Sequence, residues 1–481
     1  MINDIELVIN KLKEETNNNE YLIIRNKKIN NINISIIYYE PLVSSIKISE
    51  YIIKSLNKLN NNLIYNIKNN IYNFKYKEIY TYNELVEYIN RGFCILLLDG
   101  FNIGFALEVK NEPIRAVSTP ETDKTVRGSK DAFIEDMQTN IGLVKKRIRN
   151  NNLWFKNITL GKYTRTSISI LYINGITDKK LLKKIINRIK KIEIDGIFSS
   201  GELKNLIENE SKSTFPTTMT TERPDTVAKS LLDGKISIIV DNCPYAIIIP
   251  AFLNDFFKTS EDDYGKSINV SFTRIIKYIS FWISLLTPSI YISLITYNQE
   301  IVPLDLLISF ASQRVGVPFP VFIEAFIMII FFEILRESDL RTPNFTGSSL
   351  SIVGALILGQ SAVNAGIVSP IMIIVVAITA ISSLPFTEFE LINSIRFYRF
   401  IFMIGATLMG TIGIVLSFIY FITKLASLYT YEKPYLIPYV PFYIDGIKNS
   451  IIKFPKKLLD KREKYLTKNI RREKVWKLKY L

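Results

Sequence analysis

The sequence predicts an α/β N-terminal domain of two subdomains, an all-α polytopic membrane domain of about four to five helices, and a basic C-terminal tail. Three observations support this fold class. Strand-like and helix-like patterns alternate over positions 1–265. Long stretches between Ile275 and Thr423 then carry almost no charge. From Lys453 to Leu481, twelve Lys or Arg residues outnumber three acidic residues, a net charge of +9. The predicted boundaries are 1–112 and 113–265 for the two subdomains, 266–430 for the transmembrane helices and 431–481 for the tail.

The first subdomain contains a helix–glycine–hairpin unit that returns later in the chain. Residues 1–80 are rich in Asn and Lys, and their apolar positions predict helices with local disorder. A short helix capped by Asn83 follows and stops at Gly92, and two strands joined at Asp99-Gly100 come next. The same pattern recurs at identical spacing further along the chain, with Asp225 as cap, Gly234 as stop and Asp241 at the turn. This spacing suggests a structural repeat, although helix–hairpin units are common in unrelated folds.

The second subdomain adds a strand followed by an amphipathic helix. The strand is predicted in GKYTRTSISILYING, and the helix TDKKLLKKIINRIKKI begins at Thr177 or Asp178. Its outer face is strongly cationic, which is typical of a solvated helix surface.

Three apolar stretches predict membrane spans. Residues 275–297 are long enough to cross the hydrocarbon core. Residues 350–384 carry no charge, and a hairpin near Asn364–Pro370 would split them into two short helices. Residues 400–423 form the last predicted span. Four crossings return the tail to the side of the N-terminal domain, but Arg396 and Arg399 then fall on the opposite side, against the positive-inside rule.

Residues 321–335 form a shorter apolar segment that carries Glu324 and Glu333. The spacing between the two carboxylates is two and a half helical turns, so on a helix they point to opposite faces and do not form a paired acid and base. Two interpretations stay open. The segment is either a re-entrant or pore-lining helix, in which Glu324 repeated around an oligomer favours cations, or an amphipathic helix in the interface with its carboxylates in water.

Gln360 and Asn364 are the polar pair of the 350–384 stretch. They are separated by about one helical turn and therefore share a helix face. Interhelical hydrogen bonds and a pore lining are both compatible with this spacing. Together with Glu324 and Glu333 they are the candidate ion-path residues.

The composition excludes several classes of site. The chain has no histidine, which removes the usual general base and the common zinc ligand, and it has only two cysteines, Cys94 and Cys243. Glycine-rich phosphate loops and nucleophile elbows are also missing from the sequence. We therefore expect neither an enzyme nor a cofactor. The first residues do not resemble a signal peptide, so the N-terminal domain is expected in the cytoplasm.

Several longer segments together resemble one family. They are RAVSTPETDKTVRGSKDAFIEDMQTNIGLVKKRIR (115–149), TTERPD (220–225), SEDDYGKS with Arg274 after it, and the stretches 315–343 and 353–381. In order and spacing they are similar to the A subunits of GerA-type spore germination receptors over residues 85–480. Residues 1–80 match least. Ser129 and Asn242 depart from the family pattern, but both residue types are still compatible with a turn.

The resemblance implies a nutrient-sensing complex in the inner membrane of a spore. It implies a B and a C subunit as partners, a homo-oligomer, membrane lipids around the helices, and a cation path gated by germinant binding. The N-terminal domain and the tail would both be cytoplasmic. The mixed charges of the signature segments are suited to contact with a neighbouring subunit; the candidates are Arg115, Glu121, Arg127, Glu135, Asp136, Glu222, Arg223 and Asp225.

Competing functions remain open on the sequence alone. A secondary transporter that carries a nutrient is the alternative, although such transporters need two inverted repeats and this chain has few spans for them. The basic tail does not predict nucleic-acid binding, because its charges lie where anionic lipid head groups would meet them.

Overall fold

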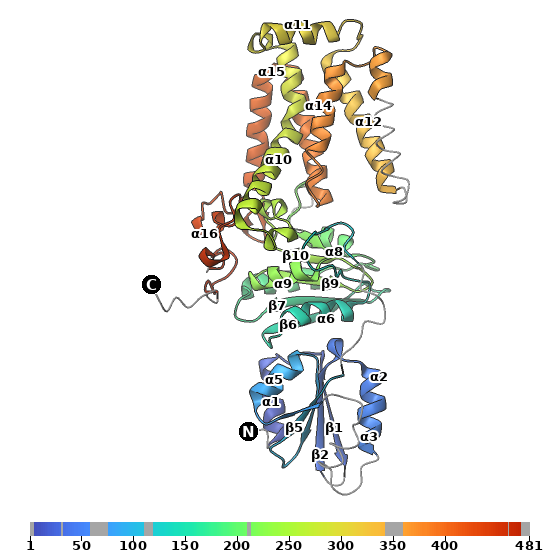
Figure 1. The fold of residues 1–481 in the computed structure, drawn as a ribbon, viewed down its shortest axis with the longest axis vertical. Helices are drawn as coiled ribbons and strands as arrows, with labels where there is room; N and C mark the ends of the chain where they lie inside the picture. The colour runs from blue at the N-terminus through green and yellow to red at the C-terminus, as the bar shows by residue number, and fades with distance from the viewer. Residues whose placement is uncertain are drawn as a thin grey trace.

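Two five-stranded antiparallel sheets stack end to end beneath a bundle of long helices (Figure 1). The computed structural model describes residues 4–29, 32–57, 76–109, 119–208, 213–341, 359–459 and 461–472. The first and the last described segments of the chain both lie on the sheet side of the bundle (Figure 1).

The first sheet has the strand order β1-β2-β4-β5-β3. Its elements are α1 Ile5–Glu15, β1 Leu22–Ile29, β2 Ile32–Tyr39, η1 Glu40–Leu42, α2 Ser45–Lys47, η2 Ile48–Ile53, α3 Lys54–Asn57, β3 Tyr76–Ile79, α5 Tyr82–Asn90, β4 Cys94–Leu98 and β5 Gly104–Leu107. The expectation of helices in residues 1–80 is confirmed for α1, α2 and α3 and is wrong for β1, β2 and β3. The run of β2 is apolar on both faces because one face packs on α1 and α5 and the other on η2 and α3. A short run buried on both faces has no alternation to mark it as a strand.

The second sheet repeats this topology position by position, with the order β6-β7-β9-β10-β8. Its elements are α6 Met137–Arg147, β6 Leu153–Leu160, β7 Thr166–Ile173, α7 Lys179–Lys190, α8 Ser200–Ile207, β8 Met219–Thr221, α9 Pro224–Leu232, β9 Ile236–Val240 and β10 Ala246–Ile249. The shared strand order confirms the structural repeat, and Asp178 caps α7 as predicted.

The predicted caps of α5 and α9 are wrong, because both helices begin earlier than expected. Thr81, not Asn83, caps α5 through a capping box with Glu84.

The two sheets share one hydrophobic core, formed by α1 and α5 from the first and α6 and α9 from the second. A lysine is buried in this contact. Lys145 of α6 is 2% exposed; its amine donates to the Asn150 carbonyl at 2.9 Å and lies 4.4 Å from the ring centre of Tyr39. Burial disfavours the charged form and lowers the pKa of the Lys145 amine to about 7.

This buried amine predicts a pH-dependent stability. Between pH 10.5 and 7 the unfolded chain binds a proton at Lys145 that the folded chain does not, so stability falls as the pH is lowered through this window. Lys145→Met removes the effect. The variant is expected to gain unfolding temperature over the wild type near pH 7, and the gain is expected to shrink toward pH 10. Thermal unfolding at both pH values measures this, with the exposed neighbour Lys146→Met as control. An equal gain at both pH values would contradict the prediction.

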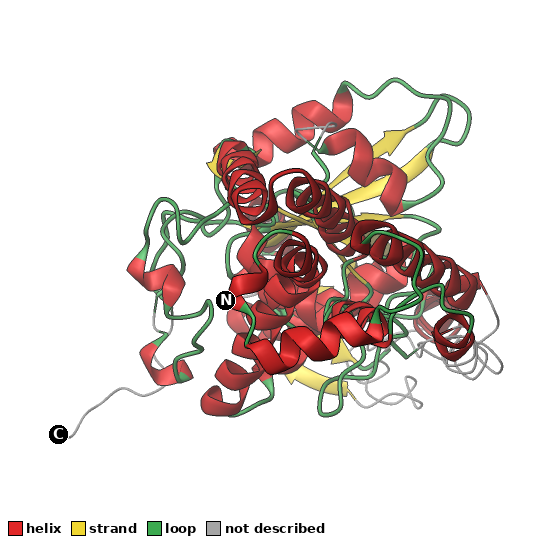
Figure 2. Ribbon diagram, turned by 90° about the horizontal axis from the view of Figure 1, so that it is seen from above, coloured by secondary structure: helices red, strands yellow, loops and turns green. Residues whose placement is uncertain are grey.

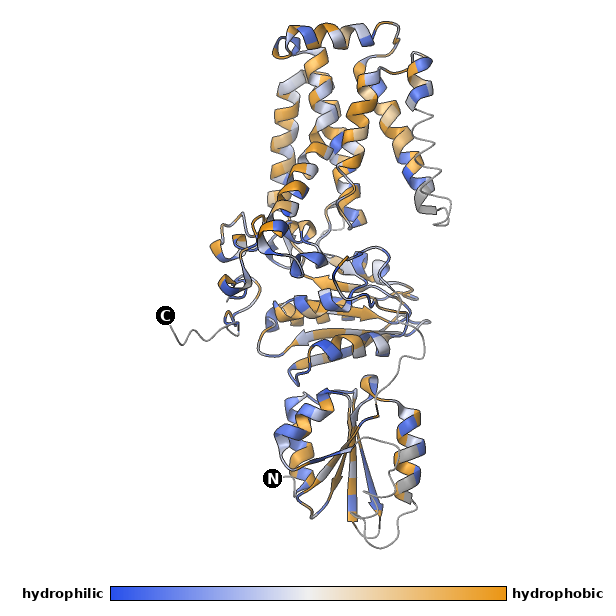
Figure 3. Cartoon of the chain, viewed as in Figure 1, coloured by the Kyte–Doolittle hydropathy of each residue, from blue (hydrophilic) through white to orange (hydrophobic). Residues whose placement is uncertain are grey.

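The helical region contains α10 Ser267–Thr296, α11 Leu304–Gln313, α12 Val321–Arg341, α14 Pro370–Ile381 and α15 Phe389–Ser427. Among the described residues, α10 and α15 are long and apolar enough to cross a membrane, and α14 is apolar but shorter. Figure 2 looks down on the bundle. Figure 3 shows that its helices are mostly hydrophobic, whereas the sheet domain mixes hydrophobic and hydrophilic residues. Helix α11 lies across the far end of the bundle (Figure 1).

Helix α15 is a hairpin of two antiparallel arms. At Gly410 the backbone leaves helical geometry, with φ +58° and ψ −133°. Phe402 and Phe421 then face each other at a ring distance of 6.0 Å, although a straight helix would separate them by about 28 Å. The prediction of one straight span over 400–423 is therefore wrong. Arg396 and Arg399 then lie on the first arm, whose start is bound to the sheet domain, and not on the opposite side as the four predicted crossings required.

The 350–384 stretch is interrupted as predicted. The described end of a helix, 359–364, stops before Gly366, whose φ is +65°, and α14 starts at Pro370. Residues 350–358 lie outside the described ranges.

The tail folds back along the second sheet. It contains β11 Tyr429–Thr430, β12 Lys433–Pro434, α16 Ile444–Ile447 and η6 Lys456–Leu458. The Thr430 hydroxyl donates to the Thr217 carbonyl at 3.0 Å, and the Tyr431 hydroxyl donates to the Ile207 carbonyl at 2.7 Å. These bonds connect the end of α15 to the sheet domain.

Candidate functional site: the charged junction between sheets and helices

The TTERPD segment (220–225) runs from the end of β8 into the first turn of α9 and holds the signature loop 119–131. Glu222 is 6% exposed, and its Oε1 accepts hydrogen bonds from the backbone N–H groups of Thr122 at 2.6 Å and Asp123 at 3.0 Å. Burial raises the pKa of the Glu222 carboxyl, but these hydrogen bonds outweigh it and keep the pKa below its usual value. Glu222 is therefore a charged anchor for the loop.

Arg223 is the centre of this arrangement, and it is fully buried. Its guanidinium binds the Asp225 carboxylate in a bidentate manner, at 3.1 and 2.6 Å. The remaining N–H groups donate to the Asp123 carbonyl, the Thr125 hydroxyl and the Ser129 carbonyl at distances between 2.9 and 3.2 Å. All of its donors are thus used. Asp225 is not the cap of α9, as the sequence suggested: the cap position is Arg223, with Pro224 after it, and Asp225 is held by the arginine instead.

Hydrogen bonds continue from the loop to the segment before α10. The Ser260 hydroxyl donates to Asp123 Oδ2 at 2.6 Å and lies 2.8 Å from the Thr226 hydroxyl. Tyr264 donates to Asp225 Oδ2 at 2.7 Å. Burial raises the pKa of Asp123. One polar network therefore runs from the signature loop through α9 to the entry of the first long helix.

Arg274 fastens α10 to the tail. It is 1% exposed; its Nε donates to Asp262 Oδ2 at 2.7 Å, and its Nη1 donates to the carbonyls of Asn449 and Ser450. Asp262 belongs to η4 Ser260–Asp263, directly before the helix. A buried, charge-assisted ion pair of this kind fixes the helix relative to its surroundings.

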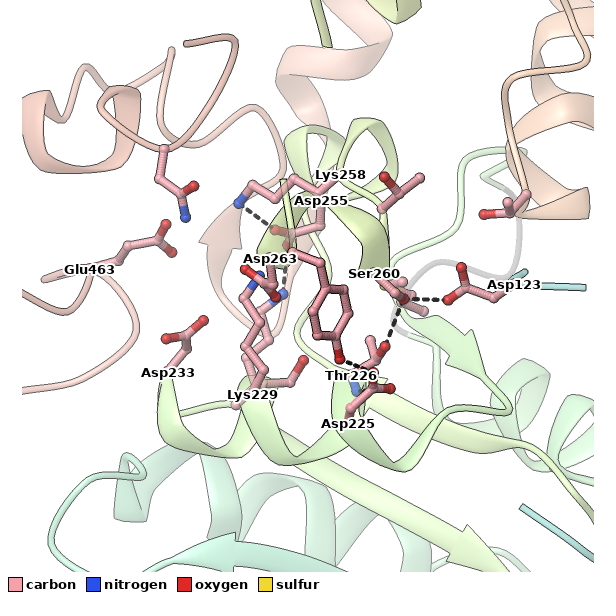
Figure 4. A pocket seen from close by; sticks show the side chains of 17 residues that line it. Asp123, Asp225, Thr226, Lys229, Asp233, Asp255, Lys258, Ser260, Asp263 and Glu463 are labelled. Atoms are coloured by element: carbon pink, nitrogen blue, oxygen red, sulfur yellow. Dashed lines mark hydrogen bonds and ion pairs between the residues drawn. The ribbon is translucent and has the colours of Figure 1, made fainter. Parts of the chain in front are cut away.

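A cavity of about 110 Å³ opens beside these groups, between α9, η3 Leu253–Phe257 and the tail (Figure 4). Its carboxylates are Asp123, Asp225, Asp233, Asp255, Asp263 and Glu463. Lys235 and Lys258 bind the two oxygens of Asp255 at 2.7 and 3.1 Å. Burial opposes the Asp255 charge, but Lys235 and then Lys258 outweigh it and hold the pKa of Asp255 well below its usual range. Asp263 pairs with Lys229, and Asp225 and Asp233 pair with arginines. The described residues contain no group of three metal-binding side chains.

A second connection joins the sheets to α15. Lys204 of α8 is 2% exposed and lies 2.8 Å from Glu388 and 2.7 Å from Glu390. The Thr220 hydroxyl adds a bond to Glu388. The second sheet is thus attached to α15 by buried ion pairs, and to the segment before α10 by the hydrogen bonds of Ser260 and Tyr264.

In the bundle, Glu324 is fully buried. Its carboxylate lies 3.1 Å from Arg314 Nη2 and accepts bonds from the Ser369 N–H at 3.1 Å and hydroxyl at 2.9 Å. The interpretation of a flat interfacial helix with its carboxylates in water is therefore wrong for Glu324. Helix α12 instead stands beside the other helices (Figure 1). Glu333 has different partners, Arg396 at 3.0 Å and Arg399 at 3.7 Å.

The other predicted site residues divide by exposure. Of the candidate ion-path residues, Gln360 and Asn364 are exposed. The candidate subunit-contact residues differ: Glu222 and Arg223 are buried and bonded within the chain, whereas four are exposed, namely Glu121, Arg127, Glu135 and Asp136. Asp136 also caps α6, accepting from Thr139 N–H at 2.7 Å. Arg115 lies outside the described residues. The structure brings Glu222, Arg223 and Asp225 together and separates Glu324 from Glu333.

The ion pairs of Arg274 with Asp262 and of Lys204 with Glu388 were not predicted. Arg274, Asp262 and Glu388 lie near the ends of the apolar region, which is the only signal that the sequence offers, and Lys204 gives none. The partner of each charge depends on how distant segments pack.

Known proteins resemble this chain along most of its length. The family described as "Bacillus/Clostridium GerA spore germination protein" matches residues 10–465. Spore germination protein KA of Bacillus subtilis (strain 168) is 38% identical over 468 residues, covering 96% of this chain and 86% of the relative. Spore germination protein A1 of the same organism is 33% identical, covering 94% and 93%.

Among solved structures, the N-terminal domain of the A subunit of the Bacillus megaterium spore germinant receptor GerK3 aligns at 32% identity with a TM-score of 0.42. The alignment covers 52% of this chain and 96% of that one. Because the family match runs along nearly the whole length and relatives are 33% and 38% identical, this chain belongs to the GerA family of spore germination proteins.

Proposed function

We propose that this chain is the A subunit of a nutrient-sensing germination receptor in the inner membrane of a spore. It acts with B and C subunits, and copies of it form an oligomeric path that conducts cations when a germinant binds the complex. The sheet domain and the tail lie on the cytoplasmic side, and lipids surround the bundle. Family membership supports the germination role, and the apolar α10 and α15 support the membrane location.

The observation that carries the gating proposal is the rigid attachment of the second sheet to two helices. The buried pair of Lys204 with Glu388 connects the sheet domain to α15. Hydrogen bonds of Ser260 and Tyr264 connect α9 to the segment whose Asp262 binds Arg274 of α10, so that a movement of the sheet is transmitted to both helices. The exposed charges Glu121, Arg127, Glu135 and Asp136 are available to contact a neighbouring copy. A change in the contact between neighbouring copies would therefore move the helices of the bundle.

Gln360 and Asn364 are the best candidates to line the path, since both are exposed on one helix face. Leucine at both positions is expected to slow cation release from spores given nutrient by about tenfold. An ion-selective electrode measures the release. Gln313→Leu, an exposed amide on α11, is the control and is expected to leave the rate unchanged. Normal release from the Gln360→Leu/Asn364→Leu spores would remove this face from the path.

A separate comparison tests whether Glu324 acts by its charge or through Arg314. Glu324→Gln leaves the Arg314 guanidinium without its counter-charge and is expected to slow release. If Glu324 positions α12, adding Arg314→Gln restores the rate, because no unpaired charge remains. If Glu324 is itself part of the cation path, the double variant stays slow.

A further inference from the structure

The first turns of α10 carry an exposed apolar face. Ile268 is 84% exposed and Phe272 is 66% exposed. Ile275 and Ile279 are also exposed, and the helical period places all four side chains on one face. The last two belong to the predicted membrane span 275–297. The apolar face of the span therefore continues below it to the beginning of the helix.

The length of α10 places these first turns in the head-group layer of a bilayer. The helix has 30 residues and is therefore about 45 Å long. The hydrocarbon core of a bilayer is about 30 Å thick, and the bilayer with its head groups is about 40–45 Å thick. With residues 275–297 in the hydrocarbon, the turns before them lie among the head groups nearest to the sheet domain.

The tail is bonded to α10 at this same level. Besides Arg274, two further side chains of the helix hold it. The Ser271 hydroxyl accepts a hydrogen bond from the Lys453 N–H at 2.9 Å. The Tyr278 hydroxyl lies 2.8 Å from the hydroxyl of Tyr439. Ser271 and Tyr278 are separated by about two turns, so the tail follows the helix for about 10 Å.

This part of the tail is unusually apolar on its surface. Figure 1 shows its helix α16 beside the lower end of α10. Six large apolar side chains are exposed here, namely Val440, Phe442, Ile444, Ile452, Phe454 and Leu458. Single exposed apolar residues are normal, but a group of them in one short segment marks an interaction surface.

The charge of the chain indicates what covers this surface. Residues 453–481 carry a net charge of +9, and the whole chain carries +15. A second copy of the chain brings charge of the same sign, whereas an anionic bilayer surface brings the opposite sign. Segments that bind in the interface of a bilayer combine exposed apolar residues with lysines in this way.

We propose that the exposed apolar side chains of 440–458 and of the first turns of α10 insert among anionic lipid head groups on the sheet side of the membrane. The lysines of the tail then face the lipid phosphates. Because the tail also binds Arg274, this insertion holds the junction of α10 and the sheet domain at the membrane surface. The inference rests on the membrane location within the proposed function, but not on cation conduction.

The test is the depth of single fluorescent labels on the full-length chain in phosphatidylglycerol bilayers. Phe442→Cys and Ile452→Cys each receive a nitrobenzoxadiazole label, and the native cysteines are both buried. Lipids that carry a nitroxide near the head group are expected to quench both labels about twofold, and aqueous iodide is expected to quench them little. Leu7→Cys is the control, because Leu7 is 67% exposed on α1 of the first sheet. Its label is expected to be quenched by iodide and not by the lipid.

A label at Ile419→Cys tests the membrane location separately. Ile419 is 57% exposed on the second arm of α15, and the lipid nitroxide is expected to quench its label. Without this quenching, the membrane location and the tail inference are both wrong. If the label at Ile419 is quenched by lipid and the two tail labels are not, only the tail inference is wrong.

The quencher that reaches the tail labels also identifies what covers the surface. Quenching by iodide alone would show that water covers it, and protection from both quenchers would assign it to a neighbouring copy of the chain. In phosphatidylcholine bilayers, lipid quenching of the tail labels is expected to fall about twofold. Equal quenching in the two lipids would contradict the role of the lysines. The readout involves no cation flux, so failure of the proposed channel leaves it interpretable.

Discussion

Gly413→Ala is expected to prevent the α15 hairpin from forming and to remove most of the folded protein. A Cβ atom at Gly413 would lie 1.8 Å from the backbone oxygen of Gly405 on the opposite arm. Neither backbone can yield without opening the hairpin, since Ser417 already lies against Gly405. A forced separation of two packed helices belongs with the most destabilising single substitutions, at roughly 4 kcal/mol.

The loss is measured as the fraction of detergent-solubilised chain that elutes as a single folded species and as its unfolding temperature. Gly359→Ala is the matched control, because a Cβ at this helical glycine meets Ile373 at an ordinary 3.6 Å. The control is expected to behave as the wild type does. If Gly413→Ala folds with an unchanged unfolding temperature, the two arms are not in contact and the hairpin is incorrect.

Arg223→Ala is expected to release the signature loop and to destabilise the sheet domain by about 3–5 kcal/mol, the usual cost of removing one partner of a buried pair. The substitution leaves the Asp225 carboxylate without its bidentate partner. It also leaves the carbonyls of Asp123 and Ser129 without the donors that hold the loop. The loop then detaches from the segment that leads into α10.

Limited trypsin digestion measures this detachment, because Lys124 and Lys130 lie in the loop. Cleavage there is expected to be about tenfold faster in Arg223→Ala than in the wild type. Arg127→Ala, an exposed arginine of the same loop, is the control and is expected to leave cleavage at the two lysines unchanged. Arg223→Lys separates charge from geometry: a lysine keeps the charge but loses the fork, and an intermediate rate is expected. Equal cleavage of all four proteins would show that Arg223 does not hold the loop.

Local patterns predicted much of the fold correctly. The two hairpins, the cap of α7 and the break before α14 each depend on residues close together in the chain. The repeat could be predicted for the same reason: the glycine that ends each helix and the residue at each hairpin turn have the same spacing in both subdomains. The strands before Tyr80 were missed for two reasons. Strand β2 is buried on both faces and so shows no alternation, and the sequence around its neighbour β1 is rich in Asn and Lys.

The order of charged α/β subdomains before apolar helices could be inferred without a structure, because hydrophobic periodicity and charge are local properties of the chain. The reversal of 400–423 at Gly410 could not, since a glycine is compatible with both a close helix contact and a turn. Nor could the sequence show that Arg223, Arg274 and Glu324 are bonded inside the chain. The partner of a charge depends on which distant segment packs beside it, and no local pattern records that choice.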